Sequence, residues 1–284
     1  MTRRQFLGNS TVGVGTACYL AGRARECAAA PLGLPVGFQV YPLRQALAAD
    51  FAGTLRQMAA WGYRTVEMCS PPGYATSGFG PLAKMKAAEI RQAIQTAGLR
   101  CESSHFQFRE LRESLDERIA WSKEMGLTQM VLSTFGLPNN AAMPDWMRAA
   151  DELNKIGDET QKAGIQLGFH NHNFEFQKID GVLVYDKLMG QLDAKLVKMQ
   201  FQVAVMSLGY EAATYLTKYP GRFLSLHLAD WSAAEKKQVP IGKGVVDWAK
   251  LFAAARTAGV KNYFVEIDLD LMKASIPYLH GLKA

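Results

Sequence analysis

The chain has 284 residues, of which 49% are hydrophobic and 20% are charged, a composition typical of a globular protein with a sizeable core. Its formal net charge is +6, but residues 1–30 hold four arginines against one glutamate, so half of that charge lies at the N-terminus. The rest of the chain has no basic run with interleaved aromatic residues. This distribution argues against a nucleic-acid-binding protein.

The first 30 residues are expected to be an export signal. Residues 2–7 contain an Arg-Arg pair and resemble the twin-arginine motif, a weakly apolar stretch follows at 10–22, and three alanines stand at 28–30. The apolar stretch is too short and too rich in glycine for a stable membrane anchor. This order predicts a twin-arginine signal peptide recognised by the export machinery, and a periplasmic or secreted mature chain of residues 31–284. A chance arginine pair is the alternative.

From residue 36 onward, short apolar runs alternate with amphipathic stretches. Strands are expected at residues 36–41, 65–69, 100–105, 129–133, 165–172, 197–203, 223–228 and 263–267. Helices are expected between them at residues 51–61, 81–97, 111–125, 146–163 and 248–258. A glycine such as Gly62 or Gly98 precedes most of the strands, as expected where a helix ends just before a strand. This alternation predicts an α/β protein, a single (β/α)8 TIM barrel with a short last helix.

Polar residues gather where the predicted strands end, which is where TIM barrels carry their active sites. Along a strand every second side chain shares a face, so His170 and His172 are expected to point to the same side. One histidine near a strand end is usually structural, whereas several on one rim indicate a functional site. The candidates, in chain order, are Tyr41, Arg44, Glu67, His105, His170, His172, Glu175, Gln202, His227, Asp230, Trp231, Lys243 and Glu266.

Several motifs in order resemble the sugar phosphate isomerase/epimerase family of xylose isomerase-like TIM barrels. They are GFQVYPLR at 37–44, GYRTVE at 62–67, SSH at 103–105, HNHNFEF at 170–176, KYPGRF at 218–223, GKGVVDW at 242–248 and YFVE at 263–266. The resemblance covers about residues 36–282. It implies a barrel that removes a proton next to a sugar carbonyl with the help of one divalent metal. The motifs do not specify the substrate, because such barrels host several sugar chemistries.

The resemblance also implies a set of metal ligands. His170 takes the place on the fifth strand, His227 on the seventh and Glu266 on the eighth, while Gln202 stands where the family carries aspartate. Ala229 replaces a lysine common in relatives of this type. Two imidazoles, an amide and one carboxylate suit manganese, zinc, iron or cobalt better than calcium or magnesium. Losing a carboxylate should weaken metal binding, and a polar pocket without metal is the alternative.

The acid/base groups follow from the same placement. Glu266 is one candidate, and His172 or Glu175 would supply the second, because a reversible epimerase needs a group on each face of the carbon. The remaining candidates are predicted to shape the pocket and bind substrate hydroxyls: Tyr41, Arg44, Glu67, His105, Asp230, Trp231 and Lys243. The alternatives are a salt bridge at the rim for Glu67, packing for Trp231 and a solvated charge for Lys243.

The predicted function is therefore a metal-assisted isomerase or epimerase. Export favours a non-phosphorylated sugar or keto-sugar, since sugar phosphates are mainly cytosolic. Strand five carries His170 where an epimerase would carry a glutamate opposite Glu266. A lyase or hydratase acting on a 3-keto-glycoside fits this asymmetry at least as well as an epimerase does. A non-catalytic carbohydrate-binding barrel is the third alternative. An endonuclease is disfavoured by the modest charge of the mature chain. Assembly into a homo-oligomer is left open.

Overall fold

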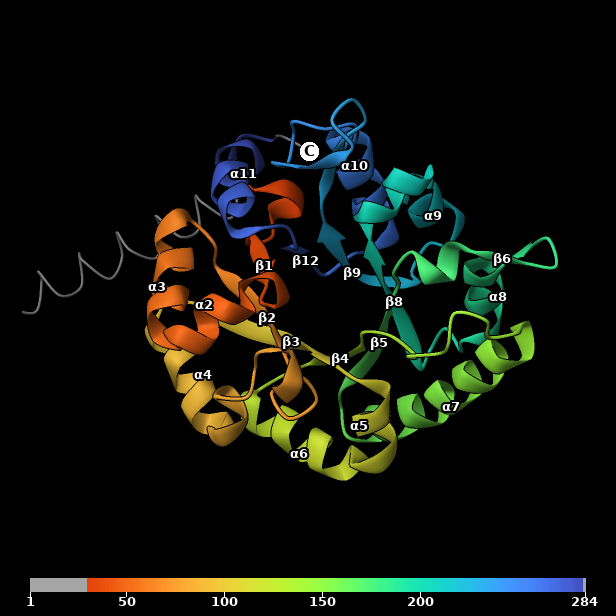
Figure 1. Cartoon of the computed structure of the whole chain (residues 1–284), viewed down its shortest axis with the longest axis horizontal. Helices are drawn as coiled ribbons and strands as arrows, with labels where there is room; N and C mark the ends of the chain where they lie inside the picture. Colours follow the sequence, from red (N-terminus) through yellow and green to blue (C-terminus); the bar gives the residue numbers. More distant parts are fainter. Residues whose placement is uncertain (1–29, 283–284) are drawn as a thin grey trace, which may run out of the picture.

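A computed structural model describes residues 30–282, so the predicted signal peptide lies outside the described residues except for Ala30. Eight parallel strands close into a barrel in the order β1-β2-β3-β4-β5-β8-β9-β12, with helices around it (Figure 1). The predicted (β/α)8 barrel is thereby confirmed. The barrel strands are β1 Gly37–Gln39, β2 Thr65–Cys69, β3 Arg100–Phe106, β4 Gln129–Leu132, β5 Gln166–His170, β8 Val197–Gln202, β9 Phe223–Leu228 and β12 Asn262–Val265.

Five strands end earlier than their sequence pattern predicts, and two of these ends, those of β5 and β12, position site residues. β5 ends at His170 rather than at residue 172, because the backbone N–H of His172 donates to Glu175 Oε2 at 2.7 Å instead of to a neighbouring strand. β12 ends at Val265, which places Glu266 just beyond the strand. The polar side chains at these ends therefore stand on the first residues of loops as well as on the strands themselves.

The helices alternate with the barrel strands. They are α2 Arg44–Ala49, α3 Phe51–Trp61, α4 Ala87–Thr96, α5 Phe108–Glu113, α6 Leu115–Met125, α7 Met143–Lys162, α8 Val184–Gln191, α9 Ala212–Lys218, α10 Trp248–Ala258 and α11 Leu269–Gly281. Both α3 and α10 have the predicted bounds. Each begins at an aspartate whose side chain accepts a backbone N–H, from Gly53 to Asp50 and from Lys250 to Asp247.

Three helix predictions need correction. The stretch 81–97 is divided into a short turn at Leu82–Lys84 and α4, and the stretch 111–125 is divided at Ser114 between α5 and α6. The last helix, α11, is 13 residues long although it was predicted to be short. Its length closes the ring of helices beside β1.

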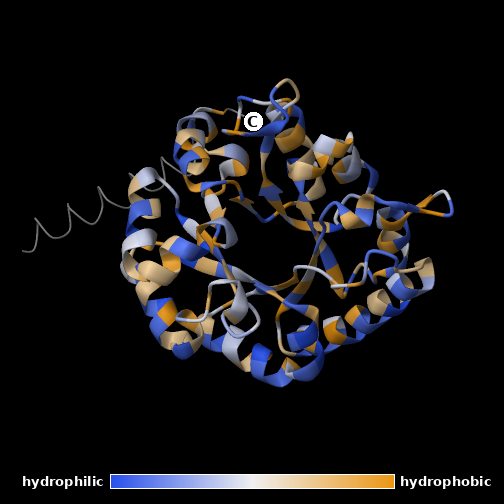
Figure 2. Ribbon diagram, viewed as in Figure 1, coloured by the Kyte–Doolittle hydropathy of each residue, from blue (hydrophilic) through white to orange (hydrophobic). Residues whose placement is uncertain are grey.

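Hydrophobic residues fill the space between the strands and the helices. Phe38, Phe169, Phe201, Tyr263 and Trp248 are among the largest side chains that are fully buried. Figure 2 shows hydrophobic and hydrophilic residues alternating along the outer helices, as amphipathic helices require. Within residues 30–282, none of the helices has the length and apolar character needed to cross a membrane.

Two small hairpins are added to the barrel. The strands β6 Lys178–Ile179 and β7 Val182–Leu183 pair after β5, and the strands β10 Asp230–Ser232 and β11 Lys237–Val239 pair after β9. Both follow the C-terminal end of a barrel strand. They are local additions to the loops around the predicted site.

Candidate active site and histidine cluster

A hydrogen-bonded polar layer lies inside the barrel. Glu67 on β2 accepts hydrogen bonds at Oε1 from Ser103 Oγ at 2.6 Å and from Gln200 Nε2 at 2.8 Å. The same Gln200 nitrogen donates to Ser225 Oγ at 2.8 Å. All four residues are fully buried and come from β2, β3, β8 and β9. We call this group, Glu67, Ser103, Gln200 and Ser225, the polar platform.

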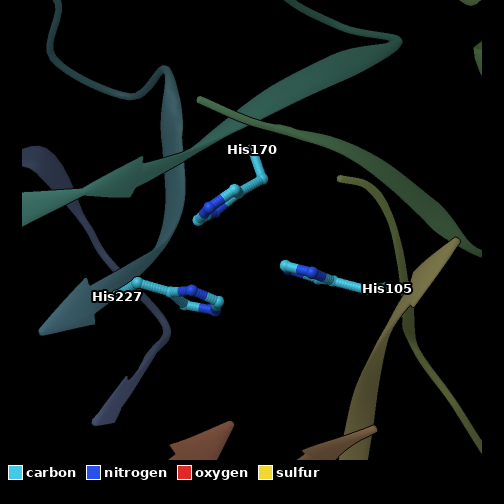
Figure 3. A group of neighbouring side chains, drawn as sticks. All are labelled: His105, His170 and His227. Atoms are coloured by element: carbon cyan, nitrogen blue, oxygen red, sulfur yellow. The ribbon is translucent and has the colours of Figure 1, made fainter. Parts of the chain in front are cut away.

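Three histidines lie together beside the polar platform. His105, His170 and His227 project toward one another from β3, β5 and β9 (Figure 3). One ring nitrogen from each lies within 4.8 Å of the others, a spacing that can hold a metal ion. The strand-end rule had predicted that these residues converge.

Gln200 determines which nitrogen carries the hydrogen in two of these rings. Its Oε1 accepts hydrogen bonds from His105 Nε2 at 2.6 Å and from His170 Nδ1 at 2.9 Å. Burial, followed by the neighbouring His227, holds the pKa of His170 well below its usual value, and burial also lowers the pKa of His105. His170 is therefore neutral, with a lone pair on Nε2 that is buried and has no hydrogen-bond partner among the described residues. A neutral imidazole oriented in this way is suited to bind a metal.

His227 lies between two carboxylates. Its Nε2 is 2.5 Å from Glu67 Oε2, and its Nδ1 is 2.9 Å from Glu266 Oε2. Both nitrogens face acceptors, so both carry hydrogen. Burial by itself would lower the pKa of His227, but the two carboxylates outweigh burial and raise it to about 9. Burial would likewise raise the pKa of Glu67, but His105 and His227 lower it to about 2.

The charges of this cluster fit a divalent cation. Ionised Glu67 and Glu266 with a protonated His227 leave one net negative charge in a buried place, which is costly. A divalent ion bound with loss of the His227 proton would make the cluster neutral. Imidazole and carboxylate donors of this kind suit divalent transition metals. The residues present therefore fit the metal, which would exchange for a proton on binding.

Glu266 has one oxygen held and one free. Its Oε2 accepts hydrogen bonds from His227 Nδ1 and Gln202 Nε2, whereas no described donor contacts Oε1. The side chain is 18% exposed, in contrast to the fully buried Glu67. Its pKa is lowered because His227 outweighs the effect of burial. Glu266 is thus an oriented carboxylate with an oxygen available to a ligand.

Gln202, predicted as a metal ligand, has other partners in this arrangement. Its Oε1 accepts a hydrogen bond from Ala204 N at 3.2 Å, and its amide nitrogen points to Glu266. The three-histidine group instead contains His105, which the sequence had assigned to substrate binding. The predicted and observed groups share His170 and His227.

The other acid/base candidates lie in the loop after β5. The His172 ring is 4.7 Å from that of His170, so the two rings are neighbours as predicted. Burial lowers the pKa of His172 to about 4, and its Nδ1 is buried without a described partner. Glu175 is fully buried, and burial raises its pKa to about 7. Its hydrogen bond to the backbone of His172 makes it a support of this loop.

The predicted pocket residues differ in where they lie. Glu67 is part of the buried platform and not of a rim salt bridge. Tyr41 is 37% exposed, and Arg44 stacks on its ring with 4.7 Å between Cζ and the ring centroid. Arg44 Nη1 also donates to the Tyr41 carbonyl at 2.9 Å. This pair follows β1 and is accessible to a ligand.

Asp230 organises a loop. Its buried carboxylate accepts hydrogen bonds from the backbone of Trp231 and from Trp248 Nε1, both at 2.9 Å. Three further backbone donors come from Gly242, Gly244 and Val246. The carboxylate is therefore committed to the loop rather than to a ligand. Trp231 is half-buried and Lys243 is exposed on this same segment.

The residue that sequence reasoning most undervalued is Gln200. It forms four hydrogen bonds, to His105, His170, Glu67 and Ser225. The available signal was the alternation of polar and apolar residues in Val197–Gln202, which places Gln200 on the same face as Gln202. The partners that make it central lie on four other strands and are brought together only by the closed barrel.

The family is shown by a match that covers most of the chain. Residues 55–273 match the family model described as xylose isomerase-like TIM barrel. The chain belongs to this family. Among curated relatives, it is 25% identical over 236 residues to an inosose dehydratase of Geobacillus thermodenitrificans, covering 69% of this chain and 78% of that protein. It is also 24% identical over 160 residues to an inosose dehydratase of Lacticaseibacillus casei, covering 49% and 52%, so that match spans about half of the relative.

Solved structures share the fold at low sequence identity. A sugar phosphate isomerase/epimerase from Parabacteroides distasonis has a TM-score of 0.72 at 24% identity, over 87% of this chain and 94% of that one. A probable 3-DHS dehydratase from Bacillus anthracis has a TM-score of 0.67 at 10% identity, over 87% and 98%. A structure described as IOLI protein with a binding zinc atom has a TM-score of 0.61 at 13% identity, over 87% and 94%. These similarities concern the fold.

Proposed function

We propose that the chain is a metal-assisted lyase that removes the proton next to a carbonyl of a non-phosphorylated keto-sugar and then expels the oxygen substituent on the following carbon. The observation that carries this proposal is the state of Glu266. One of its oxygens is fixed by His227 and Gln202, and the other has no described partner in a side chain that is 18% exposed. A general base needs this combination of fixed orientation and access.

Glu266 takes the proton from the carbon next to the carbonyl. The electron pair of the broken C–H bond forms the enolate, and its return breaks the bond between the next carbon and its oxygen substituent. The proton held by Glu266 then passes to the departing oxygen, which leaves as water or as an alcohol. In the site without metal, the His227 imidazolium lowers the pKa of the Glu266 carboxyl group and so favours its ionised form.

The divalent metal, when bound, would supply a Lewis acid that stabilises the negative charge developing on the carbonyl oxygen. His105, His170 and His227 are the side chains best placed to hold it. Glu67 would support this set from the polar platform through its contacts with His227 and His105.

Elimination fits the acid/base groups better than epimerisation does. An epimerase needs a proton-transfer group on each face of the carbon, whereas among the described residues of this cluster Glu266 is the one carboxylate with an oxygen that has no donor. A syn elimination needs one carboxyl group that first accepts and then returns a proton. Curated relatives that are inosose dehydratases support the same class of reaction.

The proposed export supports a substrate without phosphate, because sugar phosphates are mainly cytosolic. We further propose that residues 1–30 direct export, which would expose the enzyme to periplasmic or extracellular sugars. Cell fractionation of the intact chain and of an Arg3→Lys, Arg4→Lys double variant tests this localisation separately from the activity.

The test of the proposed function is turnover of keto-sugars in deuterated water. Incubation with an inosose, ketohexoses and 3-keto-glycosides should yield an α,β-unsaturated ketone, detected by ultraviolet absorbance, or an enol that tautomerises to a diketone, detected by NMR. Mass spectrometry should show loss of water or of the aglycone. Exchange of deuterium into recovered substrate without any eliminated product would contradict the lyase assignment.

An epimerase remains the second candidate because of one observation. His172 Nδ1 is buried, lacks a described partner and belongs to a ring 4.7 Å from that of His170, so a second proton-transfer group is at hand. Deuterium exchange together with inverted stereochemistry would support this candidate. Sugar binding with neither exchange nor elimination across the panel would favour a non-catalytic barrel.

A further inference from the structure

A groove lies beside the histidine cluster, between the loop after β4 and the loop after β5. Its volume is about 530 Å³, within the range of small-molecule sites. Leu137, Asn139 and Trp146 line one side, and Asn173, Phe174 and Gln177 line the other. None of these residues belongs to the acid/base or metal-ligand groups described above.

The groove lies next to the candidate active site, because Asn173 and Phe174, which line it, directly follow His172 in the chain. The Phe174 ring centroid is 6.1 Å from that of His172, and the His172 ring is 4.7 Å from that of His170. Beneath the groove, Phe135 stacks on Phe169, the residue before His170, with 4.7 Å between ring centroids. A ligand that reacts at the histidine cluster can therefore extend into the groove across Phe174.

The lining matches one chemical class of ligand. Phe174 is 55% exposed and lines the groove, so its ring is accessible to the apolar face of a ligand. The amides of Asn139, Asn173 and Gln177 can each donate and accept hydrogen bonds, as vicinal hydroxyl groups require. No described residue that lines the groove is charged, which favours a neutral ligand over a phosphate or a carboxylate.

Trp146 supplies an independent observation. It is 3% exposed and lies at the start of α7, and its ring meets Phe135 edge to face at 6.2 Å. Its Nε1–H is buried and has no hydrogen-bond acceptor among the described residues. A buried indole N–H normally has a partner, so a ligand oxygen in the groove would complete it.

We infer that this groove binds the second sugar of a glycoside whose oxidised ring reacts at the histidine cluster. This inference rests on the proposed function and narrows its substrate to a keto-glycoside rather than a free keto-sugar. The apolar face of the second pyranose ring lies on Phe174, and one of its oxygens accepts the Trp146 N–H. The glycosidic oxygen bridges the two halves of the site.

Binding of unreactive sugars tests the groove without relying on turnover. Isothermal titration calorimetry would compare cellobiose and maltose with glucose. We expect wild-type protein to bind at least one disaccharide about tenfold more tightly than glucose. Phe174→Ala should remove about tenfold of that affinity and Trp146→Phe about fivefold, from the loss of a ring contact and of a hydrogen bond. Val182→Ala, a change of an exposed side chain on the β7 hairpin, is the matched control and should bind as the wild type does.

Circular dichroism of each variant confirms that the comparison uses folded protein. Equal affinity for glucose and both disaccharides, or unchanged disaccharide affinity in Phe174→Ala and Trp146→Phe, would overturn the inference. Disaccharide binding that depends on Phe174 supports the groove as a sugar-binding site. If such binding is found but no keto-sugar is turned over, only the proposed function is contradicted. If the protein turns over an inosose but neither groove variant changes the affinity for a disaccharide, the inference about the groove is wrong and the proposed function is still supported.

Discussion

Two neighbouring regions of the barrel differ in whether their buried polar atoms have hydrogen-bond partners. In the polar platform, the side chains of Glu67, Ser103, Gln200 and Ser225 form a connected set of hydrogen bonds. At the end of β5, four buried polar atoms have no described partner: His170 Nε2, Asn171 Nδ2, His172 Nδ1 and Glu175 Oε1.

This difference indicates that the platform supports the site and that the end of β5 binds the ligand. A satisfied buried network holds one arrangement, because each broken bond would leave a polar group unpaired. Unpaired buried atoms are costly unless a ligand or ion completes them. We therefore expect substitutions in the polar platform to act on stability and orientation. At the end of β5, which we call the open end, we expect substitutions of His170 and His172 to act on binding and turnover, whereas Glu175, which supports the loop, should act on stability.

The largest effect is expected for Glu266→Gln. Glu266 is linked to Glu67 of the platform through His227 and to Asn171 of the open end through Gln202. The amide of the variant retains the shape and an oxygen for His227, but it cannot accept a proton. Turnover of a keto-sugar should fall about 1,000-fold, or about 4 kcal/mol in the barrier. Glu235→Gln, at an exposed position in the β10–β11 hairpin, should be unchanged. A fall of less than tenfold in steady-state kinetics would exclude Glu266 as the base.

Glu67→Gln probes the platform itself. It leaves the His227 imidazolium with one carboxylate partner in a fully buried place, and removing one member of a buried ion pair costs about 3 kcal/mol or more. Urea unfolding should report this loss. Glu117→Gln removes an exposed ion pair with Arg118 and should change the unfolding free energy by less than about 0.5 kcal/mol. Similar losses in the two variants would contradict a platform that stabilises the fold.

The pH dependence of stability probes the open end. The folded-state pKa of Glu175 is about 7, above its usual value of 4.5, so the folded state favours the protonated carboxyl. This contribution is fully present below about pH 4.5 and is lost as the pH rises through 7, by about 3 kcal/mol.

Glu175→Gln should abolish that decline, because the amide resembles the protonated acid and does not titrate. Thermal and urea unfolding between pH 4.5 and 8 would measure the difference between variant and wild type. The variant should gain relative stability as the pH rises. Parallel stability curves would mean that folding does not raise the pKa of Glu175.

The smallest effect is expected for Gln200→Leu on metal binding. Protein purified without chelator should carry close to one divalent transition metal per chain, and His227→Ala should remove it. Gln200→Leu leaves the three rings present but without the oxygen that orients His105 and His170. Loss of such a supporting contact typically weakens a metal site 10- to 100-fold, measurable by competition with a chromophoric chelator. Unchanged affinity would show that the rings hold the ion without the platform.

The fold was predictable because its signals are local. Alternating apolar runs and glycines at helix ends, as at Gly62, recur along the chain, and the rule that barrel sites lie at strand ends located His105, His170 and His227. The network around Gln200 was not predictable in this way. Its partners come from four other strands, and their pairing depends on the closed barrel and on its register.

Strand and helix ends were also poorly predicted, for a related reason. Apolar alternation continues past the last ladder hydrogen bond, so the pattern could not reveal that Glu175 captures the N–H of His172 and ends β5. The role of Asp230 depends on donors 12 to 18 residues further along the chain. Its neighbours Trp231 and Lys243 gave no local sign of this contact.

The carboxylate of Asp230 has a consequence for how specificity could change. It accepts five N–H donors from the segment between Trp231 and Trp248, so this loop is held in one conformation by its own hydrogen bonds. Little conformational entropy remains to be lost there if the loop contacts a ligand. Exchange of the outward side chains on such a preorganised loop would change what those side chains can contact while leaving the backbone unchanged. The fold thereby separates the evolution of selectivity from the maintenance of its scaffold.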